Sequence, residues 1–255
     1  MTECESDSEK CLFVSDFACK CIRKVCLKEG TPKVSKFADV PYPPNGLSIT
    51  PEGNLLVSCD PDKLLELSVT TGEIVFEMQL LSDIVDPKLA IKRKDSQYVV
   101  SCDVKYVLHR VCIVGPDGYL RHEYGGMDGP GDLQLRTPCY LAIGDDDHVL
   151  VADKGNGRIV LLNSELQFVS NLCELDEPHR LFFDSGVKRL YVGEGTSGNV
   201  KVFQVDVGGT KTCVTGLPMP YNIRLPITRP RFPDPPHPEP WRHSFLPRHA
   251  MHRRY

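Results

Sequence analysis

Short apolar runs separated by polar turns recur along most of this chain. Some runs alternate apolar and polar residues with a period of two, and others are continuous stretches of Val, Ile and Leu. Neither pattern has the three-to-four-residue spacing of an amphipathic helix, whereas both are typical of short strands bounded by Gly, Pro, Asn and Asp. The pattern therefore predicts an all-β protein.

One of these runs returns at nearly constant spacing. Its five copies are CLFVSDF, NLLVSCD, QYVVSCD, HVLVADK and RLYVGEG, with central valines at Val14, Val57, Val100, Val151 and Val192. The valines are 43, 43, 51 and 41 residues apart, and the last four follow a proline by 13 or 14 residues. The prolines are Pro44, Pro87, Pro138 and Pro178. Repetition on this scale indicates a repeat architecture.

Each repeat holds four β-type runs joined by turn residues, such as Pro116–Gly118 in the third copy. Four strands in about 43 residues are typical of a β-propeller blade. The predicted blades cover residues 11–38, 44–80, 87–125, 138–173 and 178–205. Only three strands are evident before Pro44 and after Pro178, so roughly 18 strands are expected, which do not complete a ring of four-stranded blades.

The fourth copy resembles the NHL repeat. Residues Gly125 to Pro138 resemble the glycine-rich inter-blade loop of that family, and VADKGNGRIVL, Val151 to Leu161, resembles its core motif. Other copies depart from the motif, since Cys59 and Cys102 stand where it has Asp. The resemblance implies an NHL-type β-propeller of four-stranded blades, with about five blades present and truncated from a six-bladed ring.

The repeats are most similar in style to the C-terminal domain of tripartite-motif (TRIM-NHL) proteins. This similarity implies a non-catalytic protein-interaction module like the substrate-recognition propeller of those ubiquitin ligases. Ligase activity would need a RING domain, and nothing in this sequence matches one. The alternative is an RNA-binding NHL domain in post-transcriptional regulation, and the third hypothesis is a metal-dependent propeller enzyme such as a lyase or lactonase.

Strand order within a blade places the inter-blade loops and the turns between second and third strands on one face, where we expect binding. The residues predicted there as ligand contacts are Arg158, Tyr140, His179, Arg180, Lys154, Lys105 and Lys63. Arg158 is the main candidate among them, because a guanidinium can make bidentate contacts with a ligand. Asp153 and Asn156 are predicted to be structural instead, because such side chains hydrogen-bond nearby backbone in turns.

The charge on this face bears on the partner. Acidic residues outnumber basic ones in the loops assigned to it, and a basic footprint for nucleic acid is not evident. Outside the tail, only His179 is well placed for the converging ligands of a metal enzyme. We therefore expect a protein partner, with RNA possible, and no DNA, metal, cofactor or catalytic residue.

The two ends differ from the repeats. Residues 1–10 are an acidic segment, and residues 208–255, which hold ten of the 21 prolines, are predicted to be a disordered Pro/Arg/His-rich tail. There is no signal peptide and no long apolar run, so a cytoplasmic protein without membrane contact, its cysteines reduced, is expected. The cluster CKCIRKVC lacks the paired spacing of a zinc site.

Overall fold

The chain forms antiparallel β-strands almost throughout. The structure is a computed structural model that describes residues 2–6, 9–27, 32–104 and 108–205. Within those ranges the only helices are two 3-10 turns, η1 (Asp145–Asp147) and η2 (Lys154–Asn156). The predicted tail, 208–255, and the candidate residue Lys105 lie outside the described residues.

The strands build five sheets, each a meander in which sequence neighbours pair. The first sheet contains β1 (Thr2–Ser6), β2 (Glu9–Asp16), β3 (Cys21–Leu27) and β4 (Lys33–Asp39). The second contains β5 (Pro44–Ile49), β6 (Leu55–Cys59), β7 (Lys63–Leu67) and β8 (Ile74–Gln79). The third contains β9 (Pro87–Lys92), β10 (Tyr98–Val104), β11 (Leu108–Val114) and β12 (Leu120–Gly126).

The last two sheets complete the series. The fourth contains β13 (Pro138–Ile143), β14 (Val149–Asp153), β15 (Arg158–Leu162) and β16 (Phe168–Glu174). The fifth has three strands among the described residues: β17 (Pro178–Asp184), β18 (Arg189–Glu194) and β19 (Val200–Gln204). The four repeat prolines are the first residues of β5, β9, β13 and β17, and the second, third and fourth sheets have the four strands that the repeat predicted.

The N-terminal segment differs from the prediction. The sequence indicated no first strand ahead of β2, but Thr2–Ser6 pairs along its whole length with Glu9–Phe13, so Cys4 lies opposite Cys11. The first sheet is therefore four-stranded. Residues TECES have no run of apolar residues to mark a strand, and the pairing is made through the backbone, which carries a donor and an acceptor at every such residue.

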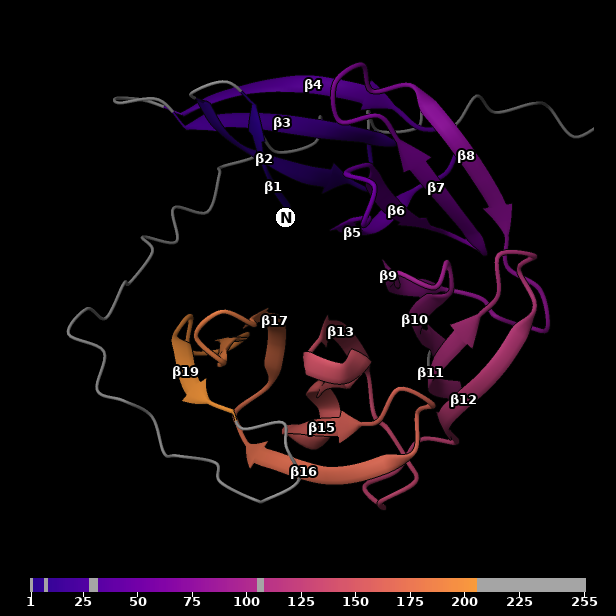
Figure 1. The fold of residues 1–255 in the computed structure, drawn as a ribbon, viewed down its shortest axis with the longest axis vertical. Coiled ribbons are helices and arrows are strands. Elements are labelled where there is room, and N and C mark those ends of the chain that lie inside the picture. Colours follow the sequence, from indigo (N-terminus) through magenta and orange to yellow (C-terminus); the bar gives the residue numbers. More distant parts are fainter. Residues whose placement is uncertain (1, 7–8, 28–31, 105–107, 206–255) are drawn as a thin grey trace, which may run out of the picture. The chain divides into compact units, whose positions relative to one another are not determined.

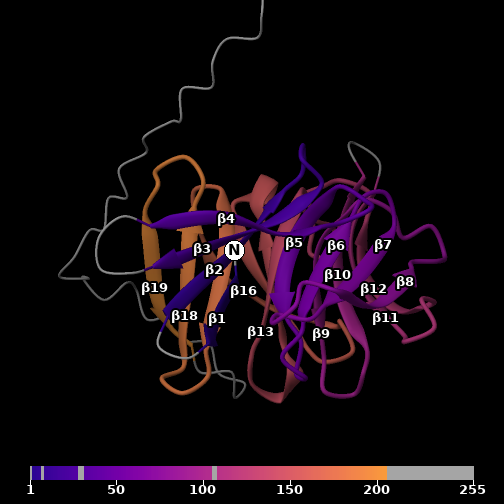
Figure 2. The same ribbon diagram turned by 90° about the horizontal axis from the view of Figure 1, so that it is seen from above.

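Neighbouring sheets pack face to face around a common centre, with β5, β9, β13 and β17 nearest to it (Figure 1). One apolar cluster fills each of the four spaces between consecutive sheets, as Phe13 and Leu65 do between the first and second. Seen from the side, the strands of the second and third sheets run between the two faces of this arrangement (Figure 2). The fold is that of a five-bladed β-propeller.

Burial explains why the second strands are so apolar. Every residue of β6 and of β14 is buried, because both faces of a middle strand are covered by adjacent sheets. The outer strand β8 is exposed except at Met78, which faces the third sheet. Each fully buried Leu or Val of these strands contributes roughly 1.5–3 kcal/mol to folding.

Candidate functional site at the inter-blade loops

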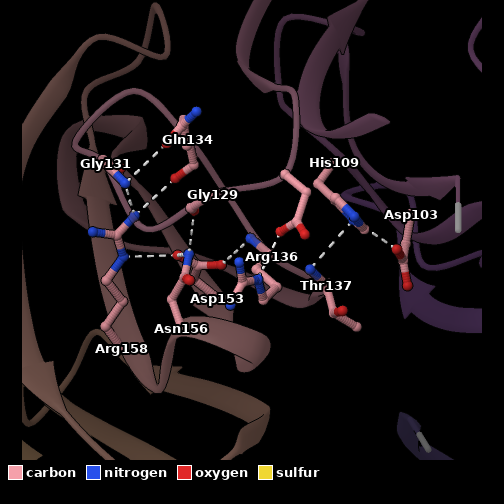
Figure 3. A network of polar contacts seen from close by, with 11 residues as sticks. Asp103, His109, Gly129, Gly131, Gln134, Arg136, Thr137, Asp153, Asn156 and Arg158 are labelled. Atoms are coloured by element: carbon pink, nitrogen blue, oxygen red, sulfur yellow. Dashed lines mark hydrogen bonds and ion pairs between the residues drawn. The ribbon is translucent and has the colours of Figure 1, made fainter. Parts of the chain in front are cut away.

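The long inter-blade loop, residues 127–137, connects β12 to β13. It is hydrogen-bonded to the last residue of β14. Asp153, the last residue of β14, is fully buried. Its Oδ1 accepts a hydrogen bond from the backbone N–H of Arg136 at 2.6 Å. Its Oδ2 accepts from Nδ2 of Asn156 at 2.8 Å and from Nε of Arg158 at 2.7 Å. One carboxylate thus joins the loop, the η2 turn and β15 (Figure 3).

Arg158 points into this loop. Its guanidinium donates to the carbonyl oxygens of Pro130 at 3.2 Å, Gly131 at 3.0 Å and Gln134 at 2.7 Å. The residue is only 7% exposed. Figure 3 shows the side chain directed at Gly131 and Gln134. The guanidinium that was predicted to contact a ligand therefore makes its hydrogen bonds to the long inter-blade loop.

Asn156 makes the third anchor of the loop. Besides its bond to Asp153, its Nδ2 donates to the carbonyl of Gly129 at 2.8 Å. Gly157, which ends the η2 turn, has a positive φ of 63°, a conformation that glycine adopts without strain. Through these contacts, Asp153 and Asn156 connect the η2 turn to the long inter-blade loop.

Burial raises the pKa of Asp153, against the opposing effect of its three hydrogen bonds and of the Arg158 charge. A carboxylate without hydration is costly unless it is paired. Both carboxylate oxygens of Asp153 accept hydrogen bonds from protein groups, which take the place of water.

The third sheet also reaches the long loop. Nδ1 of His109, on β11, lies 2.7 Å from Oδ1 of Asp103 and 3.3 Å from the backbone N of Thr137 (Figure 3). A single ring nitrogen cannot donate to one and accept from the other, so we assign its proton to the shorter contact with Asp103. The sequence placed His109 on a third strand but did not indicate that its ring would lie between Asp103 and the long loop.

The structure brings four of the predicted contact residues together between the fourth and fifth sheets. Cζ of Arg180, on β17, lies 4.9 Å from the ring centroid of Tyr140, on β13. Nη1 of Arg180 is 2.7 Å from Nδ1 of His179. Lys154, on the adjacent turn, has its Nζ 3.7 Å from Oε2 of Glu177. We call Tyr140, Lys154, His179 and Arg180 the Arg180 cluster.

Arg180 is the exposed cation of this cluster. It makes no ion pair with any carboxylate in the described ranges, whereas Lys154 has one. Burial lowers the pKa of His179, and the charges of Arg180 and Lys154 lower it further, with Glu177 opposing them. A neutral His179 can accept the Arg180 hydrogen bond, which orients the guanidinium over Tyr140.

Of the remaining predicted contacts, Lys63 does not join the cluster. Lys63, at the start of β7, pairs with Oε1 of Glu77 at 3.1 Å and lies 5.3 Å from the ring of Tyr42, all within the first half of the chain. Among the described residues, no three His, Cys, Asp or Glu side chains are grouped so as to hold a metal ion. None of the described helices is long and apolar enough to cross a membrane.

Comparison with known proteins adds relatives of limited extent. No family model matches the chain. Over 103 residues it is 32% identical to teneurin-4 of mouse and to teneurin-4 of human. That segment covers 38% of this chain and 3% of each teneurin, so the chain corresponds to a small fraction of these relatives.

Solved structures match over a larger share of the chain. A protein of unknown function from Bacteroides caccae is 19% identical, with a TM-score of 0.54, covering 83% of this chain and 82% of its own. A catalytically inactive virginiamycin B lyase from Staphylococcus aureus with quinupristin is 14% identical, with a TM-score of 0.54, over 80% of this chain and 65% of the lyase.

The third similar structure is the Cps50 (Swd1) β-propeller domain from Myceliophteria thermophila, 14% identical, with a TM-score of 0.51, over 78% of this chain and 67% of that domain. At these identities the likeness concerns the fold alone. The sheet order and these neighbours together identify the chain as a β-propeller by fold.

Proposed function

We propose that this propeller is a non-catalytic protein-interaction module, and that the Arg180 cluster contacts an acidic segment of a protein partner. The observation that carries the proposal is the exposed Arg180 guanidinium, oriented by His179 and stacked on Tyr140 without a carboxylate of its own. Arg and Tyr are enriched among the residues that dominate protein–protein binding. A guanidinium that has no ion pair among the described residues favours an acidic group in the partner.

The support beneath the cluster favours binding. Tyr140 stands opposite Ala152 in the β13–β14 ladder, and Arg180 stands opposite Gly193 in the β17–β18 ladder. Both side chains therefore project from paired strands rather than from loops. A guanidinium already held in place loses less conformational entropy when a partner binds.

The resemblance to tripartite-motif propellers extends this proposal to a substrate-recognition role, in which the bound protein is presented to a ubiquitin ligase. The lyase among the similar structures belongs to another functional class, and its 14% identity to this chain carries only the fold. Unlike a lyase, an interaction module requires no catalytic group, and the side chains of the Arg180 cluster are sufficient for binding.

A random peptide library displayed on phage tests the proposal. We expect selection on the full chain to enrich peptides rich in Asp and Glu, and Arg180→Gln to weaken the best synthetic peptide at least tenfold. Arg121→Gln is the matched control, because Arg121 is also an exposed arginine, lies on β12 and pairs with Asp117. It should leave binding unchanged.

Three results would overturn this function. The first is the absence of any enriched peptide class, and the second is equal binding by wild type and Arg180→Gln. The third is saturable binding of single-stranded RNA that falls steeply with salt and is lost in Arg180→Gln, which would assign the cluster to nucleic acid.

A further inference from the structure

The first sheet carries a pair of thiols outside the proposed binding face. Cys11 on β2 and Cys26 on β3 occupy directly opposed positions in the antiparallel register. Their Sγ atoms are 3.2 Å apart. Cys11 is 2% exposed and Cys26 is partly exposed, so an oxidant from solvent reaches the pair through Cys26.

The backbone geometry suits a covalent bond between them. Directly opposed residues of an antiparallel pair have Cα atoms roughly 4.5–5.5 Å apart, which lies within the roughly 4.4–6.8 Å range of disulfides. The two sulfurs need to approach by only about 1 Å to bond. The strands do not have to move.

A second thiol pair, in the third sheet, serves as an internal comparison. Cys102 on β10 lies opposite Arg110, and Cys112 on β11 lies opposite Val100, so these cysteines are diagonal neighbours. Both are completely buried. The hydrogen bond with Cys112, together with burial, raises the pKa of Cys102. Because neither cysteine of this pair is exposed, a solvent oxidant has no exposed sulfur to attack first, unlike in the first pair, where Cys26 is partly exposed.

We propose that Cys11 and Cys26 form a redox modification site that closes to an intramolecular disulfide. Hydrogen peroxide supplies the oxidising equivalents. The Cys26 thiolate attacks one peroxide oxygen, the O–O bond breaks, and after proton transfer Cys26 sulfenic acid and one water result. The Cys11 thiolate then attacks the sulfenic sulfur, the S–O bond breaks, and a second water leaves, so two thiols and one peroxide yield one disulfide and two waters.

The cross-link ties β2 to β3 across a separation of 15 residues. It restricts the unfolded chain, so the oxidised protein should unfold at a higher temperature than the reduced protein. A thiol reductant such as dithiothreitol reverses the step. The first sheet thereby gains two states of different stability.

Peptide mapping of the full chain tests the site. The protein is treated with hydrogen peroxide, remaining thiols are alkylated, and tryptic peptides are identified by mass spectrometry. Trypsin separates residues 11–20 from residues 25–28, so the proposed bond joins two peptides. Because residues 11–20 also contain Cys19, the mapping is done in a Cys19→Ser background.

We expect the cross-linked pair of peptides to form with peroxide, to disappear with dithiothreitol, and to be accompanied by a rise of several degrees in Tm. Cys26→Ser and the more conservative Cys26→Ala should both abolish the cross-link while retaining cooperative unfolding. Cys112→Ser, in the comparison pair, should leave it intact.

Three outcomes contradict the proposal. The first is a bond from Cys11 to Cys4, its neighbour in the β1–β2 register. The second is complete alkylation of both Cys11 and Cys26 after peroxide treatment. The third is preferential oxidation of the Cys102 and Cys112 pair. Any of them shows that position and distance in the first sheet do not select these two sulfurs.

Discussion

The third and fourth sheets each hold the inter-blade loop ahead of them with an arginine, but the residue opposite that arginine differs between the two sheets. Arg110, the third residue of β11, and Arg158, the first residue of β15, both donate to carbonyls of the preceding inter-blade loop. Arg158 lies opposite Asp153 in its ladder, and Arg110 lies opposite Cys102. Arg158 therefore faces a buried carboxylate across its ladder, whereas Arg110 faces a buried thiol.

The two arginines differ in the hydrogen bonding of their Nε atoms. Nε of Arg158 donates to Asp153 at 2.7 Å, whereas Nε of Arg110 is buried without a hydrogen-bond partner in the described structure. Arg110 reaches outward to Glu123 on β12 through Nη1, at 2.7 Å. The Glu123 side chain is 48% exposed, so solvent screens that pair. The fourth sheet holds its loop through a buried ion pair, and the third through a half-exposed one.

The largest expected effect comes from removing the buried carboxylate. Asp153→Ala leaves Arg158 buried without its counter-charge and frees the N–H of Arg136. Breaking such a pair costs about 3–5 kcal/mol of unfolding free energy. Chemical denaturation measures this, with Glu123→Ala as the control, which should cost less than about 1 kcal/mol because solvent screens its pair. Equal losses in the two variants would remove the distinction between the sheets.

Removing the arginines gives the next largest difference. Arg158→Met leaves Asp153 buried and uncompensated, whereas Arg110→Met leaves Glu123 able to face water. We expect a loss of about 3 kcal/mol in the first variant and a clearly smaller loss in the second. Urea unfolding of both proteins at one pH compares them. A greater loss in Arg110→Met would contradict the account.

Much of the fold follows from the sequence because strand patterns are local. Recurring, nearly continuous apolar runs marked the second strands, and the prolines at Pro44, Pro87, Pro138 and Pro178 marked the first ones. β1 escaped prediction because its stability depends on backbone pairing with β2 rather than on apolar side chains.

The site was harder to predict, because the direction of a long side chain depends on the carbonyls around it. Nothing in the sequence near Arg158 shows that Pro130, Gly131 and Gln134 turn their oxygens toward it. The equivalence of Arg110 to Arg158 was hidden since Cys102 replaces the Asp that identifies the motif. Aligning the two strand starts would have revealed it.

A smaller effect is expected from giving the third sheet a carboxylate. In Cys102→Asp the new carboxylate lies opposite Arg110 and can accept from its unpartnered Nε. We expect the stability to stay within about 1 kcal/mol of wild type, since pairing offsets desolvation. Val100→Asp, two residues earlier on the same face of β10 and without an opposing arginine, should lose at least about 3 kcal/mol. Thermal unfolding of both proteins tests this, and similar losses would show that Arg110 cannot use the carboxylate.

The smallest effect concerns pH. The folded state lowers the pKa of His179, so the unfolded chain binds a proton more readily. The associated stability is present above the unfolded pKa of about 6.5 and is lost as the pH falls below it. His179→Gln should therefore lose less stability between pH 7.5 and pH 5 than wild type does. An unchanged pH dependence in the variant would show that His179 does not titrate differently on folding.

Amide hydrogen exchange of residues 128–136 tests most directly the claim that the buried pair of Asp153 and Arg158 holds the long inter-blade loop. In Asp153→Asn we expect the Arg136 amide to exchange at least about tenfold faster than in wild type, because losing about 1.4 kcal/mol of local stability changes exchange by that factor. In Arg180→Gln, which alters only the exposed cluster, exchange in the loop should not change. Loop protection that is unaffected in Asp153→Asn would contradict the account.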